Sequence, residues 1–422
     1  MSGRDAPSPV DRQATFLRAT VSITACRAAS IVLASVVAIL TARELGPAGR
    51  GAFVLLLTIA SVTAVVCTFG MNLAGRVHMV AASDPIPLNE YCGLSMVLAL
   101  LSALVSGIAG ATLLPSAGVR VSAAELLLFS TLGTTLLTQL VLTDALNAFG
   151  FTVLAARVEV GGFLIQVVMV TSLVVAGVER FQLYVIAVVL SGVFQSAAAL
   201  FLLRRRVGPI RPRYHYGHWR RLIRTGSPGM PSTLSQLLTL RVDRYLVGAF
   251  LNPAAVGVYS VASTVPEFLR VVPMALGQSV FYGVASNTST AASIRRAMLT
   301  CLAATTGLAM AIFVVAPVAV ATVFGREFSG AVTPLRILLL AEIGMIFFHV
   351  EGSVLGGQGR LSAGGIAAAA GFVLVLIGDL LLIPAFDLAG AAWASVIAYS
   401  AMGLIVHRLV RSGAAGKARG TA

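Results

Sequence analysis

Four arginines inside otherwise apolar stretches are the residues best able to do chemistry in this sequence: Arg27, Arg241, Arg244 and Arg270. A guanidinium stays ionised at physiological pH and can donate two parallel N–H bonds to a phosphate group. Within a bilayer each such charge costs ~3 kcal/mol on insertion scales, so it is retained for a reason. We therefore predict that these four arginines bind the substrate through an anionic headgroup.

The alternative is that these arginines pair with acidic residues and hold helices together. Arg241 and Arg244 are three residues apart and share a helix face. Glu267 and Arg270 have the same spacing and are expected to pair within their own helix. The other acidic residues that the alternative invokes are Asp243, Glu342 and Glu351. Both interpretations stay open at this point.

A second group of titratable residues lies in the run around 332–355, where Glu342, His349 and Glu351 occur. Glu342 and His349 are seven residues apart and share a helix face. A carboxyl or imidazole within a span can take up a proton, so these residues are candidates for ion coupling; the alternative is that they satisfy a neighbouring helix. Asp144 and Asp379, near the ends of their runs, are expected to be solvated or structural.

Prolines interrupt two of the later apolar runs, at Pro228, Pro231, Pro266 and Pro273. Proline removes a backbone hydrogen bond and bends a helix. Pro266 and Pro273 are therefore candidate hinges for a conformational change, although a static kink that improves packing is the competing interpretation.

The elements that carry these residues are about twelve apolar runs in a chain of 422 residues with a mean hydropathy of +0.93. Each bilayer crossing takes ~20 apolar residues as a helix, because a backbone in lipid must satisfy its own hydrogen bonds. The sequence therefore predicts an all-α polytopic membrane protein. The expected spans are 20–42, 52–78, 90–114, 123–147, 153–177, 181–203, 227–250, 256–283, 297–323, 332–355, 361–384 and 388–409.

Charge distribution predicts the orientation of these spans. With both termini on the cytoplasmic side, the inner segments hold 20 of the basic residues and the outer loops hold six, including Arg50. The segment 204–225 alone carries eight arginines. It either fixes topology beside anionic lipid headgroups or binds a specific partner or nucleotide, and no Gly-rich phosphate loop accompanies it.

No metal, cofactor or disulfide is expected. The cysteines Cys26, Cys67, Cys92 and Cys301 lie in or beside apolar runs without paired spacing.

The chain contains an internal repeat. Leu45–Phe53 (LGPAGRGAF) aligns with Leu251–Tyr259 (LNPAAVGVY) at an offset of 206, and both follow the first helix of a half. A weaker match places Leu146 and Gly150 against Leu355 and Gly359. We therefore expect two six-helix bundles that face the same way, and transporters of this kind bind cargo at the repeat interface. The expected division is a tail 1–19, a bundle 20–203, a basic cytoplasmic linker 204–225, a bundle 226–410 and a tail 411–422.

Several motifs, in a fixed order along the chain, resemble those of a known protein family. They are the LGPxxxGxF turn, Arg241–Gly248 (RVDRYLVG) leading to Val256–Tyr259, Gly356–Arg360 (GGQGR), and Leu382–Pro384 followed by Leu388–Ala392. With these motifs the sequence resembles the polysaccharide transporter (O-antigen flippase) family of the multidrug/oligosaccharidyl-lipid/polysaccharide exporter superfamily, over nearly the whole chain.

The resemblance implies a V-shaped exporter that moves undecaprenyl-diphosphate-linked oligosaccharide, for O-antigen or exopolysaccharide synthesis, from the inner to the outer leaflet of a bacterial cytoplasmic membrane. It implies cationic residues in the first and seventh helices, matched here by Arg27, Arg241 and Arg244. The implied partners are the polyprenyl-diphosphate-linked glycan, membrane lipids, and the glycan polymerase and glycosyltransferases of the same pathway; no nucleic acid is expected.

Two other functions compete with the flippase. A drug/cation antiporter of the same superfamily would centre on intramembrane carboxylates, whereas these spans hold more arginine than acid. A membrane glycan polymerase or glycosyltransferase would show a large outer loop or paired carboxylates. The outer segments have only about 5 to 12 residues, so an enzyme is not expected.

Overall fold

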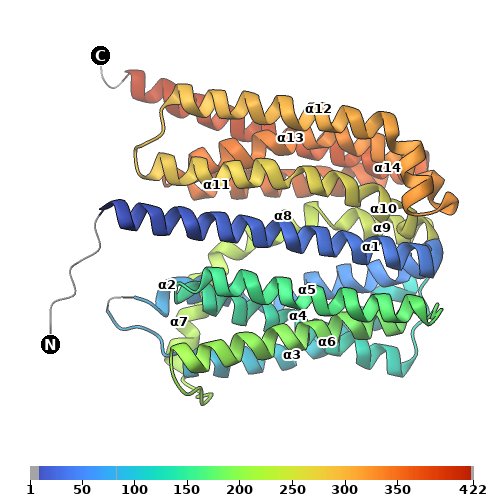
Figure 1. The fold of residues 1–422 in the computed structure, drawn as a ribbon, viewed down its shortest axis with the longest axis horizontal. Coiled ribbons are helices and arrows are strands. Elements are labelled where there is room, and N and C mark those ends of the chain that lie inside the picture. Colours follow the sequence, from blue (N-terminus) through green and yellow to red (C-terminus); the bar gives the residue numbers. More distant parts are fainter. Residues whose placement is uncertain (1–8, 82, 420–422) are drawn as a thin grey trace.

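The computed structural model describes residues 9–81 and 83–419, and this part of the chain contains helices but no strand. The long helices lie side by side along the long axis of the molecule (Figure 1). In chain order the helices are α1 (Pro9–Cys67), α2 (Met71–His78), α3 (Leu88–Ser116), α4 (Ala123–Ala148), α5 (Thr152–Val175), α6 (Phe181–Arg206), α7 (Tyr216–Gly226), η1 (Ser227–Gly229), α8 (Met230–Thr239), α9 (Val242–Phe250), α10 (Pro253–Leu269), α11 (Val271–Ala285), α12 (Ala291–Val323), η2 (Arg326–Ala331), α13 (Val332–Gly357) and α14 (Leu361–Arg419).

The described helices have the length and composition of membrane spans. Nine of them are long and apolar enough to cross a bilayer. Their outer faces carry large apolar side chains; on α3, for example, Leu100, Leu104 and Ile108 are 74%, 61% and 57% exposed. A water-soluble surface does not expose such a continuous stripe, whereas lipid solvates it. The protein is a multi-pass membrane protein.

Two of the nine candidate spans are far longer than one bilayer crossing, and each contains a single residue with non-helical torsion angles. Gly46 in α1 has φ 61° and ψ −177°, and Asp387 in α14 has φ 51° and ψ −132°. In α1 the bend is followed directly by Pro47, which cannot continue the hydrogen-bond ladder of the preceding turn. The two segments of α1 thus form a corner at Gly46 (Figure 1).

The two copies of the sequence repeat pack against each other reciprocally. A Cβ atom on Gly51 would lie 1.6 Å from the carbonyl oxygen of Pro253, and one on Gly257 would lie 1.9 Å from that of Pro47. Gly51 and Gly257 occupy the same position of the repeat, as do Pro47 and Pro253. Glycine is required at both positions because the opposing backbone approaches too closely for any side chain.

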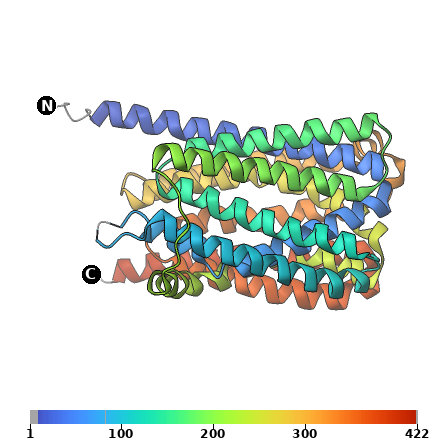
Figure 2. The ribbon, with the colours of Figure 1, turned by 90° about the horizontal axis from the view of Figure 1, so that it is seen from below.

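A shared hydrophobic core surrounds this contact. It combines residues of α1, α3, α4, α5 and α6 with residues of α9, α10, α12, α13 and α14. The aromatic residues at equivalent repeat positions, Phe53 and Tyr259, are both fully buried in it. Side chains from both halves of the sequence therefore stabilise one core, and further clusters serve each half separately. Figure 2 shows the start of α1 and the end of α14 at the same end of the molecule.

Three apolar runs that were predicted as single helices are interrupted in the structure. α1 ends at Cys67 and α2 begins at Met71, after Phe69 and Gly70 with positive φ. A non-helical Arg241 separates α8 from α9, and Arg270 joins α10 to α11. At the first break, Gly70 lies against Gly226, whose carbonyl oxygen would be 2.2 Å from a Cβ on Gly70. Close packing of distant segments thus overrides the local preference for a continuous helix.

The basic segment 204–225 is also more ordered than the expected loop. α6 extends to Arg206, and α7 begins at Tyr216. Two contacts fix α7 to the first half: Arg221 Nη1 lies 2.7 Å from Asp84 Oδ2, and His78 Nε2 lies 3.0 Å from Thr225 Oγ1. Partial burial and the nearby Arg221 guanidinium lower the pKa of His78, so this imidazole is mainly neutral near pH 7.

Candidate functional site

Three guanidinium groups gather around one carboxylate where α1 meets α9 and α10; we call Arg50, Arg241, Arg244 and Glu267 the arginine cluster. Glu267 Oε1 accepts a hydrogen bond from Arg244 Nη2 and lies 3.7 Å from Arg241 Nη1. Ser263 accepts a second bond from Arg244, at 3.1 Å. The side chain of Arg244 is 9% exposed and that of Arg241 is 33% exposed, so Arg241 is the more accessible of the two.

Arg50 is the cluster member that sequence analysis missed. The prediction of a loop at Arg50 is wrong: the residue is helical, in α1 directly after the Gly46 corner, and 7% exposed. Its Nη1 donates to Thr41 Oγ1 at 2.6 Å, and it lies close enough to Arg244 and Glu267 to interact with their charges. The Gly-Pro pair suggested a loop, but the helix resumes within one residue.

Asp243 is the second acid near the cluster, and both of its oxygens are engaged elsewhere. Oδ1 accepts from the backbone N–H of Arg244 at 2.8 Å, and Oδ2 accepts from the hydroxyl of Tyr259 at 2.9 Å. Within the described residues, Nε of Arg50 and Nε of Arg244 are buried without a hydrogen-bond partner. Even with Asp243 included, the cluster has more cations than carboxylates.

Arg270 forms a separate, balanced pair with Glu342 on α13. Its Nε lies 2.9 Å from both carboxylate oxygens and its Nη2 lies 2.7 Å from Oε1, and the Tyr399 ring lies 5.1 Å from the guanidinium carbon. The expected pairing of Arg270 with Glu267 within one helix is therefore wrong. The chain breaks at Arg270, which turns this side chain toward α13 and leaves Glu267 to the arginine cluster.

Arg27 is not part of this group. Its side chain is exposed on the first segment of α1, and its nearest acidic influence is Glu159 on α5. No hydrogen bond or ion pair joins Arg27 to another described residue. The structure thus brings Arg241, Arg244 and Arg270 near one another and leaves Arg27 apart.

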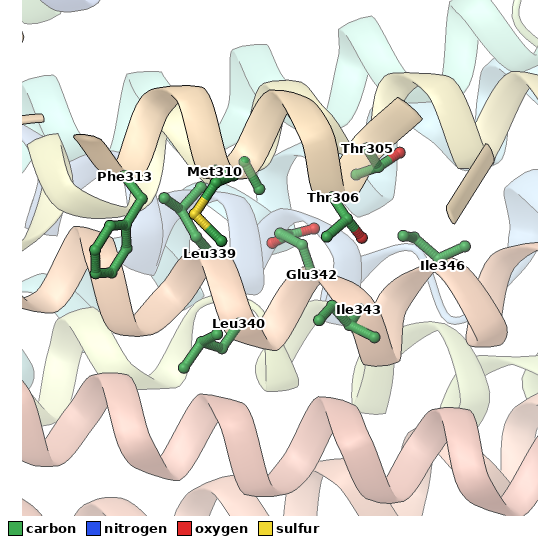
Figure 3. Close-up of a pocket in the computed structure, with 10 residues that line it drawn as sticks. Thr305, Thr306, Met310, Phe313, Leu339, Leu340, Glu342, Ile343 and Ile346 are labelled. Atoms are coloured by element: carbon green, nitrogen blue, oxygen red, sulfur yellow. The ribbon is translucent and has the colours of Figure 1, made fainter. Parts of the chain in front are cut away.

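An apolar pocket of about 360 Å³ lies between α12 and α13, beside the Arg270–Glu342 pair. In Figure 3, Thr305, Thr306, Met310 and Phe313 of α12 face residues of α13, with Glu342 among them. The α13 residues that complete the wall are Leu339, Leu340, Ile343 and Ile346. The lining suits a hydrocarbon chain more than a sugar.

The other two ion-coupling candidates lie further along α13. Glu351 contacts His407 Nδ1 through both carboxylate oxygens, at 2.9 and 3.0 Å. This pair borders a second pocket of about 900 Å³ that also contains Arg295 and Arg411. The backbone carbonyl oxygen of His349 lies close to Gly277 of α11. The imidazole of His349 is near enough to Arg270 to interact with its charge. Their role in ion coupling stays a prediction.

The hinge candidates flank the helix break at Arg270. Pro266 is buried in the last turn of α10 and Pro273 is buried in the first turn of α11. Their position beside a break agrees with their effect on a helix ladder. Whether the chain bends further there during function stays a prediction.

Asp379, which was expected to be solvated or structural, is a buried acid. It lies in α14 with no exposed surface, and neither carboxylate oxygen has a hydrogen-bond partner among the described residues. It is near enough to interact with the charge of Asp243. An unpaired buried carboxylate is costly, which makes Asp379 a candidate to bind a proton or a small cation. The sequence did not indicate this burial, because it depends on the helices around Asp379.

The family model described as "Polysaccharide biosynthesis protein" matches residues 16–289 of this chain. No curated protein sequence matches it. Solved structures are similar in fold. An inward-facing multidrug resistance MATE family transporter of the MOP superfamily has a TM-score of 0.75 at 15% identity, over 93% of this chain and 96% of that one.

The lipid II flippase MurJ, in an inward closed conformation, has a TM-score of 0.74 at 12% identity, over 93% of this chain and 87% of that one. A MOP superfamily transporter from Pyrococcus furiosus, described by a reversed polarity of its binding pocket, has a TM-score of 0.57 at 16% identity and 94% coverage of each chain. The fold is therefore that of MOP superfamily transporters.

Proposed function

The chain belongs to the polysaccharide biosynthesis protein family, and from that premise we propose that it is a flippase for undecaprenyl-diphosphate-linked oligosaccharide. It moves this lipid from the inner to the outer leaflet of a bacterial cytoplasmic membrane by alternating access. The family match and the fold shared with the MurJ flippase support this proposal.

The observation that carries the proposal is the excess of positive charge in the arginine cluster. Arg50, Arg241 and Arg244 face Glu267, and Asp243 is already bonded to Tyr259 and a backbone amide. Guanidinium groups do not lose their protons to relieve this excess. A diphosphate is a suitable counter-ion, because its oxygens accept paired N–H bonds. The accessible Arg241 makes the first contact, and Arg244 and Arg50 follow.

The remaining predicted contacts take smaller parts in this proposal. Arg270 already has a bidentate partner in Glu342, so it positions α10 and α13, and the apolar pocket beside it accommodates part of the polyprenyl chain. Arg27, exposed on the first segment of α1, meets the headgroup nearer the inner leaflet. The Asp379–Asp243 pair is added to Glu342, His349 and Glu351 as a candidate for ion coupling.

We further propose twelve crossings in two six-helix halves, residues 20–203 and 226–410, joined by the linker 204–225. The long helices α1 and α14 each cross twice by bending at Gly46 and Asp387, and α8 with α9 supplies one more crossing. The reciprocal contact of Gly51 and Gly257 supports a duplicated origin. An even number of crossings agrees with helix ends at Pro9 and Arg419 on one side, which we assign to the cytoplasm.

The test is lipid flipping by the purified protein in vesicles that contain a fluorescent polyprenyl-diphosphate oligosaccharide. We expect Arg241→Gln to lower the initial rate about tenfold or more, as loss of one charge-assisted hydrogen bond predicts, and Arg241→Lys to keep part of it. Arg180→Gln, at an exposed helix cap, is the matched control and should leave the rate unchanged. Wild-type rates in Arg241→Gln would remove this residue from the mechanism.

The second candidate function is a drug/cation antiporter, which the buried carboxylate Asp379 and the fold shared with MATE transporters favour. The same vesicles distinguish the two functions. Transport of a cationic dye against an ion gradient, without flipping of the glycolipid, would establish the antiporter and overturn the flippase.

A further inference from the structure

A cluster of metal-binding side chains lies outside the arginine cluster, at the end of the molecule where α1 begins. It consists of Glu90 in the first turn of α3 and of His215 and His218 at the start of α7, and we call it the Glu90–His cluster. One donor atom from each residue lies within 4.8 Å of the other two. Glu90 Oε2 is in hydrogen-bond contact with His218 Nδ1 and lies 3.9 Å from His215 Nδ1.

Contacts that involve none of the three donor atoms hold the cluster in place. The backbone N–H groups of Arg211 and Arg213 donate to Asn89, at 2.8 and 3.0 Å, and Trp219 Nε1 donates to the carbonyl oxygen of Glu90 at 3.1 Å. Gly93 lets the segment lie flat on α3, since a Cβ there would be 2.1 Å from the carbonyl oxygen of Arg213. The chain thus presents the three side chains to one point before any ligand binds.

An ion pair between Glu90 and His218 accounts for only two of the three groups. The two imidazole rings lie with centroids 4.3 Å apart and planes tilted by 41°, an arrangement that becomes repulsive when both rings are protonated. In their neutral forms both rings offer lone pairs beside the same carboxylate. A cation that accepts nitrogen and oxygen donors satisfies all three groups at once.

We propose that the Glu90–His cluster binds a divalent transition-metal ion of the zinc class, with two imidazoles and one carboxylate as ligands and water in the remaining position. Imidazole favours zinc, copper and nickel over calcium or magnesium, which prefer oxygen. The donor atoms need to move by only about 1 Å to reach ligand distances of ~2.0–2.1 Å. Glu90 is 14% exposed and His218 is 24% exposed, so an ion reaches the site from water.

Two features oppose binding and set what the experiment must show. His215 Nδ1 accepts the N–H of His218 at 3.2 Å as the cap of α7, and a metal bond through this nitrogen replaces that hydrogen bond. Arginines on the same segment add repulsion for any cation. Those on the described surface around the cluster are Arg211, Arg213, Arg220 and Arg221, of which Arg221 is paired with Asp84.

The consequence of binding concerns the segment 204–226, which connects the two halves of the chain. The metal ligands come from both sides of the contact between this segment and the first half. A bound ion therefore fixes the start of α7 to α3, and α7 continues through η1 directly into α8. Sequence spacing alone does not reveal this site, because Glu90 lies 125 residues before His215.

The test uses the full chain, purified in detergent with an affinity tag that contains no histidine. Titration with Co²⁺ should give the visible absorption of a nitrogen- and oxygen-ligated ion, and Zn²⁺ should displace it at one ion per chain. We expect His218→Ala, His215→Ala and Glu90→Gln each to weaken Zn²⁺ binding about tenfold or more. His78→Ala, a neighbouring histidine outside the cluster, is the matched control and should bind as the wild type does.

Absence of Zn²⁺ binding in the wild-type protein, or binding that is unchanged in His215→Ala and His218→Ala, would overturn the proposal. A second measurement needs no variant. Zn²⁺ should slow tryptic cleavage after Arg213 in the wild-type protein, and a chelator should restore it. Equal cleavage with and without Zn²⁺ would overturn the fixing of the segment. Neither measurement depends on lipid flipping, so the proposed function can fail independently.

Discussion

In the first half of the molecule the ion pair between Arg76 and Asp144 lies at one end of the bundle, with the arginine side chain 51% exposed. In the second half the pair between Arg270 and Glu342 lies within the bundle, with side chains only 11% and 3% exposed. Arg76 lies in α2, after the break that ends α1 at Cys67, whereas Arg270 occupies the break between α10 and α11. The comparison shows that a helix break alone does not bury a charge: Arg76 after the first-half break is half solvated, and Arg270 at the second-half break is enclosed by its neighbours.

The largest effect should come from breaking the interior pair. Arg270→Gln leaves the Glu342 carboxylate buried without its bidentate partner, and such a loss costs about 3–5 kcal/mol. We expect a corresponding fall in thermal stability in detergent. The double variant Arg270→Gln, Glu342→Gln should recover most of the loss, because no charge is left buried. A double variant as unstable as the single one would show that the pair is not the cause.

A smaller loss is expected where the two halves are alike. Gly51→Ala and Gly257→Ala each place a methyl group against an opposing backbone carbonyl, which no rotamer can relieve. We expect each to lower the free energy of unfolding by about 3 kcal/mol. Gly307→Ala in α12, where a Cβ meets nothing within 4 Å, is the control and should be neutral or slightly stabilising. Equal stability of all three variants would contradict the close approach.

Asp379 tests whether the second half also carries the coupling ion. Asp379→Asn keeps the size of the side chain and removes the charge, so the protein should stay folded. We expect the transport rate to lose its dependence on an imposed ion gradient. At the gradient where the wild-type protein is fastest, the rate of the variant should be about tenfold lower, equivalent to ~1.4 kcal/mol. Unchanged gradient dependence, measured in the same vesicles, would exclude Asp379 as the coupling residue.

The smallest effect should come from the pair in the first half. Arg76→Gln removes a half-solvated guanidinium but leaves the Asp144 side chain, which is 4% exposed, without that partner, so the loss should be about 1–2 kcal/mol and below that of Arg270→Gln. The measurement is thermal unfolding at low and high salt, since salt screens the charge of the half-exposed Arg76. A loss as large as that of Arg270→Gln would remove the difference between the two halves.

Much of the fold follows from the sequence, because apolar runs of this length have one stable arrangement in lipid. The repeat around Pro47 and Pro253 also predicted two positions that are equivalent in space, and the structure shows their reciprocal contact. Pro266 and Pro273 indicated a bend near Arg270, but the break at Arg241 and the position of the one at Arg270 were not predicted. They depend on packing between helices, which a single sequence does not show.

The same limit applies to the site. The types of residue at Arg241, Arg244 and Arg270 indicated buried cations, but their partners depended on which way each helix end turns. Glu267 therefore pairs with Arg244 instead of Arg270. Arg50 was missed because a Gly-Pro pair usually ends a helix, and here the corner is so tight that the next residues are already buried.

The contact at Gly51 and Gly257 also determines how the halves can move. If the two halves stay in contact at this corner, a rigid rotation about it moves atoms at the opposite end of the molecule further than atoms near the corner. The first arm of α1, from Pro9 to Gly46, is about 55 Å long at 1.5 Å per residue, so a tilt of about 10° moves its far end by ~10 Å. Under the proposed function, a small change in the corner would thus open the distant face to a sugar headgroup.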